Sequence, residues 1–419
     1  MKKEAYFATA EELARGGLET IPPQMISGKH LIYSSPATLA FNSPGAEGFG
    51  VKRAGLAVPD SIMLIVAPGC CGRNTSLISS MPEYNDRFFY LMMDETDIVT
   101  GRHLKKIPKA VKEICDCCEK KPSVVMICIT CVDALLGTDM ERVCRKAEEK
   151  VDIPVRPCYM YALTREGRKP PMVHVRQSLY SLLEPQKKKG NVVNLLGFFS
   201  PLVDDCEMYE LLQQAGVKTI HEISRCKDYE EYQTMSQANF NLVLHPEARF
   251  AAEDFHDRLK IPFIELRRLY QTDKIENQYR ALGQVLGVSF DQEVYKKAAE
   301  EAVERFREVC PDASFAVGEC MNGDPFELAL AWCGMVSGCG DLRNYHSREF
   351  CIHTASCGIE SGYKGFFQYG THHAVLRSVR ERSEPYHRKG CRILSPGSAK
   401  CRVESGPAAL WLCRGTQAV

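Results

Sequence analysis

Cysteine gives this chain its most distinctive chemistry, because 20 of its 419 residues are cysteines. Cytoplasmic proteins keep few structural disulfides, and thiolates are common ligands of zinc ions and iron–sulfur clusters. The alternative is that most of these residues are small buried hydrophobes. We expect about two to four ligands among them. Cys71 and Cys131 are the leading candidates, because each comes shortly after an apolar segment.

Those apolar segments belong to an alternation of short strands and amphipathic helices that continues to about residue 330. This alternation predicts an α/β protein with repeated doubly wound, Rossmann-like parallel sheets. Such sheets place ligand-binding residues just beyond the carboxyl ends of their strands, which is where Cys71 and Cys131 fall. The predicted strands are 61–67, 124–129, 192–197, 218–223, 240–244, 262–266 and 315–318, and the predicted helices are 131–150, 206–214, 229–237, 251–259, 272–286 and 291–309.

His245 is a candidate catalytic residue, because it ends one predicted strand directly before Pro246. Its imidazole could ligate a metal or donate a proton in a substrate cavity. The alternative is a structural role, in which it caps the strand end. The sequence leaves both interpretations open.

The overall composition limits the expected partners. The chain has 53 Lys+Arg and 53 Asp+Glu, so there is no electrostatic case for nucleic acid or an anionic membrane. No apolar run is long enough to span a bilayer, and the N-terminal residues lack the apolar core of a signal peptide. We therefore expect a cytoplasmic protein. The phosphate-binding motif Gly-x-x-x-x-Gly-Lys-Ser/Thr is absent from the sequence, so we expect this chain to bind no nucleotide.

Three blocks of sequence carry a family resemblance. Ala67–Gly72 reads Ala-Pro-Gly-Cys-Cys-Gly, Met93–Gly101 contains Asp-Ile-Val-Thr-Gly, and Ile127–Asp139 runs from a strand through Cys131 to Gly-Thr-Asp. In this order they resemble the Pro-x-Gly-Cys-Gly, Asp-Ile-Val-Phe-Gly-Gly and Cys…Gly-Asp-Asp blocks of nitrogenase component 1 type subunits. The resemblance covers roughly residues 30–331, with weaker similarities at 192–197, 240–245 and 318–329.

The resemblance implies an iron–sulfur cluster bound by Cys71 and Cys131. Such a cluster usually has about four protein ligands, so we expect a [4Fe-4S] cluster shared between two chains that each supply both cysteines. Cys70 and Cys128 are reserve candidates. Asp94 is a candidate oxygen ligand, since one tetrapyrrole-reducing relative uses an aspartate.

Departures from the family pattern argue against a true dinitrogen-reducing subunit. Nitrogenase subunits have a third cluster cysteine where this chain has Met92, Met93 and Asp94. His245 also replaces the cysteine that ligates the catalytic cluster in nitrogenase's cofactor subunit.

The resemblance instead implies the electron-accepting component of an ATP-dependent nitrogenase-like reductase with an unidentified substrate. A separate iron protein would hydrolyse ATP and supply electrons. The chain would act as a homodimer, or as a heterotetramer with a related subunit. The alternative is a non-enzymatic scaffold on which a nitrogenase-type metal cofactor is assembled, so whether the chain is an enzyme stays open.

The last part of the sequence differs in character from the rest. Residues 332–419 hold seven of the 20 cysteines, and we find no strand or helix period there. Several of its stretches can be encoded so that reading one nucleotide later gives peptides typical of globular proteins. We interpret this tail as the product of a frame shift that truncates the third domain, and we do not expect it to fold natively. A genuine cysteine-rich extension is the alternative.

The expected domains are an N-terminal arm at 1–30, α/β domains at 31–186 and 191–312, the start of a third α/β domain at 313–331, and the tail at 332–419.

Overall fold

The chain forms two compact units, one made of residues 29–201 and 217–267 and the other of residues 1–28, 202–216 and 268–419. Among the helices that are described, none is long and apolar enough to cross a membrane. The computed structural model describes residues 6–9, 15–16, 50–69, 79, 82–159, 171–309, 314–317, 327–328, 331, 364–370, 373–379, 392–394 and 400–402.

The first unit begins with a four-stranded parallel sheet in the order β3-β2-β4-β5. Every residue of β2 and β4 is buried, because both strands are continuous apolar runs covered on both faces. Alternate side chains of β2 enter two separate apolar clusters, Met63 and Ile65 on one side and Leu64 and Val66 on the other. The strands are β2 (Ile62–Ala67), β3 (Phe88–Met92), β4 (Val125–Ile129) and β5 (Val155–Tyr159).

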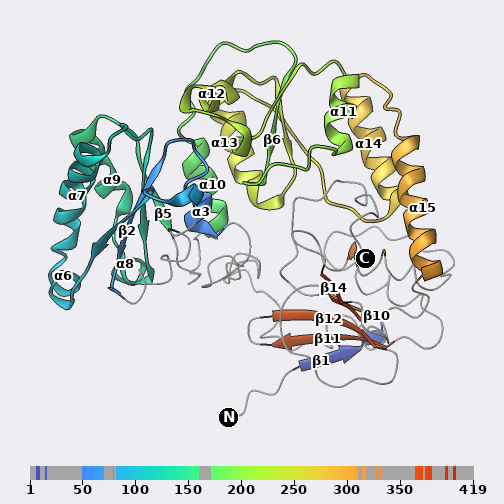
Figure 1. Ribbon diagram of the computed structural model, residues 1–419, viewed down its shortest axis with the longest axis horizontal. Coiled ribbons are helices and arrows are strands. Elements are labelled where there is room, and N and C mark those ends of the chain that lie inside the picture. Colours follow the sequence, from blue (N-terminus) through green and yellow to red (C-terminus); the bar gives the residue numbers. More distant parts are fainter. Residues whose placement is uncertain are drawn as a thin grey trace. The chain divides into compact units, whose positions relative to one another are not determined.

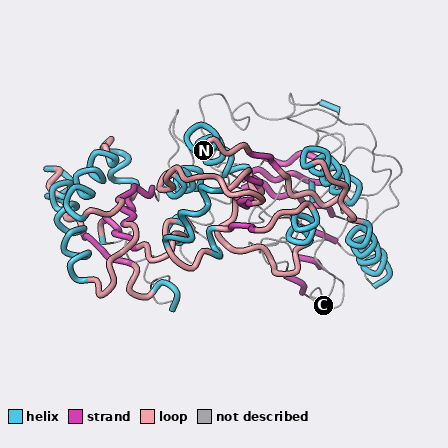
Figure 2. The backbone as a smooth tube through the Cα atoms, turned by 90° about the horizontal axis from the view of Figure 1, so that it is seen from above, coloured by secondary structure: helices cyan, strands magenta, loops and turns pink. Residues whose placement is uncertain are grey.

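Helices cover both faces of this sheet (Figure 1, Figure 2). On one face Ile107 and Val111 of α7 pack with Val143 and Ala147 of α9 against the strands. Two short helices, α6 and α8, follow the carboxyl ends of β3 and β4. The helices of this layer are α3 (Val51–Ala54) and α10 (Pro171–Tyr180) on one face, α7 (His103–Cys117) and α9 (Met140–Val151) on the other, and α6 (Glu95–Thr100) and α8 (Cys131–Leu136) at the strand ends.

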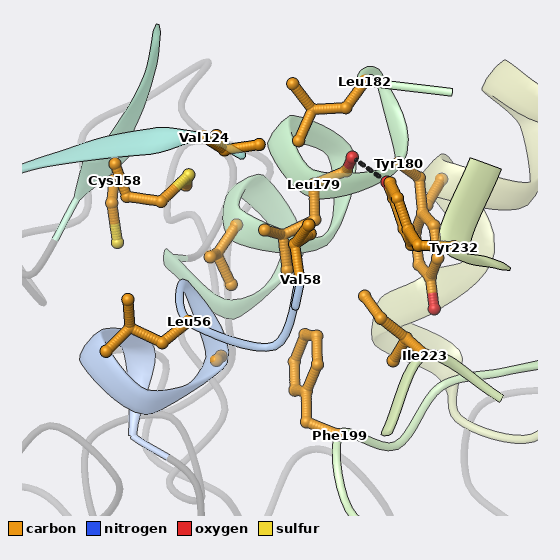
Figure 3. Close-up of a cluster of buried hydrophobic side chains, with 14 of the residues drawn as sticks. Leu56, Val58, Val124, Cys158, Leu179, Tyr180, Leu182, Phe199, Ile223 and Tyr232 are labelled. Carbon is orange, nitrogen blue, oxygen red and sulfur yellow. Dashed lines mark hydrogen bonds between the residues drawn. The ribbon is translucent and has the colours of Figure 1, made fainter. Parts of the chain in front are cut away.

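A second parallel sheet, in the order β7-β6-β8-β9, lies in the same unit. One apolar cluster continues from the first sheet through α10 to this sheet (Figure 3). There the Tyr232 hydroxyl donates a hydrogen bond to the Leu179 carbonyl oxygen at 2.5 Å. The elements are β6 (Val192–Leu196), β7 (Thr219–His221), β8 (Phe240–Val243), β9 (Phe263–Glu265), α12 (Tyr229–Gln233), α13 (Arg249–Leu259) and the short 3-10 helices η4 (Ile223–Arg225), η5 (Thr234–Gln237) and η6 (Pro246–Ala248).

In its described part, the second unit contains the helices α11, α14 and α15 and a six-stranded antiparallel sheet in the order β1-β11-β12-β10-β13-β14. The buried Tyr279 hydroxyl of α14 donates to Glu207 Oε1 of α11 at 2.7 Å. The elements are β1 (Tyr6–Thr9), α11 (Glu207–Gln214), α14 (Thr272–Leu286), α15 (Glu293–Val309), β10 (Ser314–Val317), β11 (Lys364–Gly370), β12 (His373–Val379), β13 (Arg392–Leu394) and β14 (Lys400–Arg402).

These elements confirm the α/β class with parallel sheets, and each predicted strand up to residue 318 overlaps an observed one. The prediction missed two edge strands, β3 and β5. In β3 only Phe88 is buried and the other residues are half-buried or exposed, and β5 contains Pro157, which is tolerated mainly at sheet edges. The helix predicted for 131–150 is two helices, because Gly137 adopts a φ of 67° and the Asp139 side chain caps α9 by accepting from Arg142 N at 3.0 Å.

The tail contains strands that no period in its sequence indicates. Four strands, β11 to β14, lie in residues 332–419, and whether the tail folds natively stays a prediction. Antiparallel pairing with β1 and β10 supplies these strands with partners, and such pairing does not require a clear period in the sequence. The frame shift and the domain boundaries stay predictions. The nucleotide sequence tests the frame shift, because a reading frame one nucleotide later that is rich in stop codons would exclude it.

Candidate functional site

The candidate site lies at the carboxyl ends of β2 and β4. These neighbouring strands run parallel with Val66 opposite Ile129, so their ends meet at one edge of the sheet. The helix α8 begins at Cys131, two residues beyond the end of β4. Cys70 and Cys71, which follow β2, and the side chain of Cys131 lie outside the described residues. The fold therefore brings together the two strand ends that lead to the predicted ligands.

The Cys128 side chain lies on the face of the sheet that α10 covers. It is completely buried in the apolar cluster that contains α10, and it is the in-register neighbour of Cys158 on β5. A hydrogen bond with Cys128, together with burial, raises the pKa of the Cys158 thiol well above its ordinary value. Cys128 as a ligand stays a prediction, and its burial disfavours it.

Asp94 is the N-cap of α6. Its Oδ1 accepts a hydrogen bond from Asp97 N at 2.7 Å, and the Asp97 side chain accepts one from Asp94 N at 3.4 Å, which forms a capping box. The remaining oxygen lies 3.4 Å from Arg102 Nη2. These contacts account for its position without a metal, so Asp94 as a ligand stays a prediction.

A buried polar network that the sequence did not single out lies next to Cys131. His103 Nε2 is 2.9 Å from Asp133 Oδ1, and the two side chains are 1% and 0% exposed. The Thr138 hydroxyl donates to the same Asp133 oxygen at 3.0 Å. His103 Nδ1 is 2.9 Å from the carbonyl oxygen of Asp97. Because a carbonyl oxygen only accepts, Nδ1 carries a proton and donates it there. In the sequence, this network is signalled only by a polar residue on the apolar side of its helix, His103 in α7 and Asp133 in α8.

Asp97 is the charged part of this network. Its side chain is 1% exposed and bonds to Lys106 Nζ at 2.7 Å and Arg102 Nε at 2.8 Å. Hydrogen bonds from Lys106 and then from Arg102 lower the pKa of Asp97 to about 2. When folding lowers the pKa of a carboxyl group, that group stabilises the folded protein at pH values above the carboxyl's ordinary pKa. This stabilisation is lost as the pH falls through the lowered pKa of the folded state.

Asp97→Asn should therefore lower stability at pH 6 and lose its effect as the pH falls to about 2. Urea unfolding of both proteins at several pH values in this interval measures the gap between them. Asp116→Asn is a matched control, because Asp116 makes an exposed ion pair with Lys112 and such pairs contribute little. A gap that stayed constant with pH would contradict the assigned role of Asp97.

A cavity of about 850 Å³ opens beside the carboxyl end of β4. Its lining includes Ile129 and Asp133 next to the predicted ligand, Cys144 and Arg145 from α9, and His174 from α10. Burial raises the pKa of the Cys144 thiol to about 12, so this thiol stays protonated at neutral pH and is a poor nucleophile. The lining also includes the carboxylates of Glu141 and Glu148 and the guanidinium of Arg156, so its charged walls suit a polar ligand.

His245 is the N-cap of the short helix η6. Its Nδ1 accepts a hydrogen bond from Glu247 N at 3.2 Å, and its ring contacts Phe198 edge-on at 5.8 Å between centroids. Gly197, with a φ of 140°, packs so closely that a Cβ there would lie 2.7 Å from His245 N. This is the capping geometry that the sequence left open, and a catalytic role for His245 stays a prediction.

The described residues do not complete a metal centre by themselves. Among them, no three His, Cys, Asp or Glu side chains form a group that could hold a metal ion. Cys115, Cys117 and Cys118 at the end of α7 also lack further partners of this kind within the described part. Burial raises the pKa of Cys115 to about 11.

Comparison with known proteins gives a consistent result. Residues 47–318 match the family model described as nitrogenase component 1 type oxidoreductase. The chain is 26% identical over 238 residues to the nitrogenase iron-molybdenum cofactor biosynthesis protein NifE of Nostoc sp., covering 55% of this chain and 49% of the relative. It is 28% identical over 251 residues to NifE of Rhizobium meliloti, covering 58% and 52%. The chain thus spans about half the length of these curated relatives.

A solved structure shows the same fold. The structure titled "Nitrogenase Cp1 at pH 6.5" superimposes with a TM-score of 0.53 at 16% identity, covering 76% of this chain and 73% of that one. At this identity the likeness concerns the fold alone, and it agrees with the parallel sheets and flanking helices described above.

Proposed function

The chain belongs to the nitrogenase component 1 type oxidoreductase family, and from this we propose that it is a scaffold on which an iron–sulfur-based metal cofactor is assembled for a partner enzyme. The observation that carries the proposal is its similarity to proteins named for iron-molybdenum cofactor biosynthesis. The sequence resemblance alone favours a reductase, with the scaffold as the alternative. The comparisons favour the scaffold.

Cys71 and Cys131 are the residues that would hold a cluster. Both follow parallel strands whose carboxyl ends meet at one sheet edge, the usual place for ligand-binding residues in such sheets. Their thiols are suitable donors for iron, and two per chain are half of the usual set of about four. The donor set therefore fits a [4Fe-4S] cluster shared by two chains. When bound, the cluster would supply one-electron chemistry and an attachment point for further metal.

The proposed partners follow from this ligand count. A second copy of the chain, or a related subunit, would supply the remaining thiolates. A separate ATP-dependent iron protein would supply electrons. The finished cofactor would then leave for an acceptor enzyme, so the scaffold must bind it less tightly than the acceptor does.

The reductase remains the second candidate, because one observation favours it. The cavity beside Ile129 and Asp133 places a polar space of about 850 Å³ next to the predicted ligand Cys131. A substrate bound there would lie close to a source of electrons. In that case the metal would stay on the chain through many turnovers.

The fate of bound iron separates the two functions. The full-length chain is purified anaerobically from cells grown with 55Fe, and its iron and acid-labile sulfide are measured. It is then incubated with nitrogenase component 1 that lacks its cofactor, an iron protein and ATP. A scaffold passes the 55Fe of its finished cofactor to the acceptor, whereas a reductase retains all of its 55Fe. A chain that binds neither iron nor sulfide would exclude both functions.

A further inference from the structure

Asp133 is the most unusual charged residue near the predicted ligand. Its side chain is completely buried, and burying a carboxylate is costly unless its oxygens are paired. Oδ1 contacts both His103 and Thr138, but Oδ2 has no hydrogen-bond partner among the residues that the structure describes. Such an orphaned group costs about 1–3 kcal/mol, and in native proteins it usually has a specific reason.

The position of Asp133 supplies that reason. It lies two residues after Cys131, in the first turn of α8. This helix has only six residues, too few to be stable through its own hydrogen bonds. Asp133 is held from α7 by His103, and Thr138, just past the end of α8, donates to the same carboxylate. His103 therefore ties the first turn of α8 to α7, and Thr138 ties the same turn to the segment that follows α8.

His103 is itself fixed in orientation. Its Nδ1–H donates to the Asp97 carbonyl oxygen on α6, and its ring is 1% exposed. The contacts thus run without a break from α6 through His103 to Asp133, two residues from Cys131. The Asp97 side chain adds ion pairs with Lys106 and Arg102 to the same corner.

Resting on the proposed function, we infer that the His103–Asp133 pair is a positioning element that holds the first turn of α8 so that Cys131 binds iron. Neither residue touches the metal. Partners of this outer kind orient the ligands, and losing one typically costs about 10- to 100-fold in metal affinity. Leaving Oδ2 without a hydrogen bond then costs free energy, because the Asp133 carboxylate must lie beside the cavity to support the segment that carries Cys131.

The test compares His103→Ala with His103→Gln in the full-length chain. Alanine removes both hydrogen bonds of the ring, whereas a glutamine amide can still donate to Asp133 Oδ1. A ferrous chelator is titrated against the iron-loaded proteins, and the EPR spectrum of the reduced cluster is recorded. In His103→Ala we expect iron to be lost at about tenfold lower chelator with an altered spectrum, and His103→Gln should recover most of the difference.

Asn194→Ala is the matched control for lost stability. Asn194 is completely buried and donates to Asn241 Oδ1 at 2.8 Å and to the Met235 carbonyl at 2.9 Å, but it lies in the other sheet, on β6. This variant should lose stability and keep its iron. The inference is overturned if His103→Ala holds iron as wild type does, or if Asn194→Ala loses as much. A wild-type chain without iron would instead remove the proposed function and this inference with it.

Discussion

Cys131→Ala is expected to lose nearly all bound iron and sulfide. It removes a proposed ligand, so the effect should exceed the roughly tenfold loss of affinity that follows removal of an outer partner. Cys131 begins α8 directly after the buried strand β4, so a change from cysteine to alanine at this helical position leaves the backbone pattern intact. Iron and sulfide analysis after anaerobic purification measures the loss, and Cys71→Ala should give the same result.

Cys144→Ala is the matched control for this prediction. Cys144 lies on the neighbouring helix α9, is 3% exposed and lines the same cavity. Burial raises the pKa of its thiol to about 12, so the thiol is protonated at neutral pH in the absence of metal. This variant should keep its iron. If Cys131→Ala retained a full complement while Cys144→Ala did not, the assignment of the ligand would be wrong.

The second large effect is expected at Arg176, where Arg176→Met should destabilise the unit by about 3–5 kcal/mol. The Arg176 side chain is 5% exposed and pairs with Glu247 at 2.9 Å. It also donates to the Gly197 carbonyl oxygen at 2.6 and 3.1 Å and to the Met172 carbonyl oxygen at 2.9 Å. Methionine fills a similar volume but leaves Glu247 and two carbonyl groups without their donor.

Urea unfolding followed by circular dichroism measures this change. Arg249→Met makes the same chemical substitution four residues from His245, at a side chain that is 58% exposed and pairs with Glu253 and Glu265 on the surface. Its effect should be below about 1 kcal/mol. An equal loss of unfolding free energy in the two variants would show that the burial of Arg176 does not determine its contribution to stability.

Arg176 also bears on the open question of His245. The Gly197 carbonyl that it binds and the Glu247 that it pairs with lie on either side of the His245 turn. Arg176 therefore links the residue after β6 to the η6 turn that His245 caps. It would position His245 for proton transfer, and it would equally serve a purely structural cap. A His245→Gln variant that keeps iron transfer and stability would favour the cap.

Local sequence determined the regular elements of the two parallel sheets. Strands β2, β4, β6 and β8 were predictable because runs of buried apolar residues bounded by turns have few other solutions. The helix α14 was predicted with its observed bounds. The order of strand, turn and cysteine also placed Cys131 at a strand end, since parallel sheets collect their carboxyl ends at one edge.

Contacts between distant residues were decided only by the tertiary structure. His103 and Asp133 are 30 positions apart, and no local pattern says that helices α7 and α8 meet there. The facing of Cys128 toward Cys158 depends on the register of β4 and β5, and the pairing of Arg176 with Glu247 depends on how α10 lies between the sheets. Hydrophobic periodicity encodes which face of an element is buried, but it does not encode which partner the buried polar groups meet. The sequence therefore determined that a cysteine stands at the strand end, and the tertiary structure decided which residues hold it there.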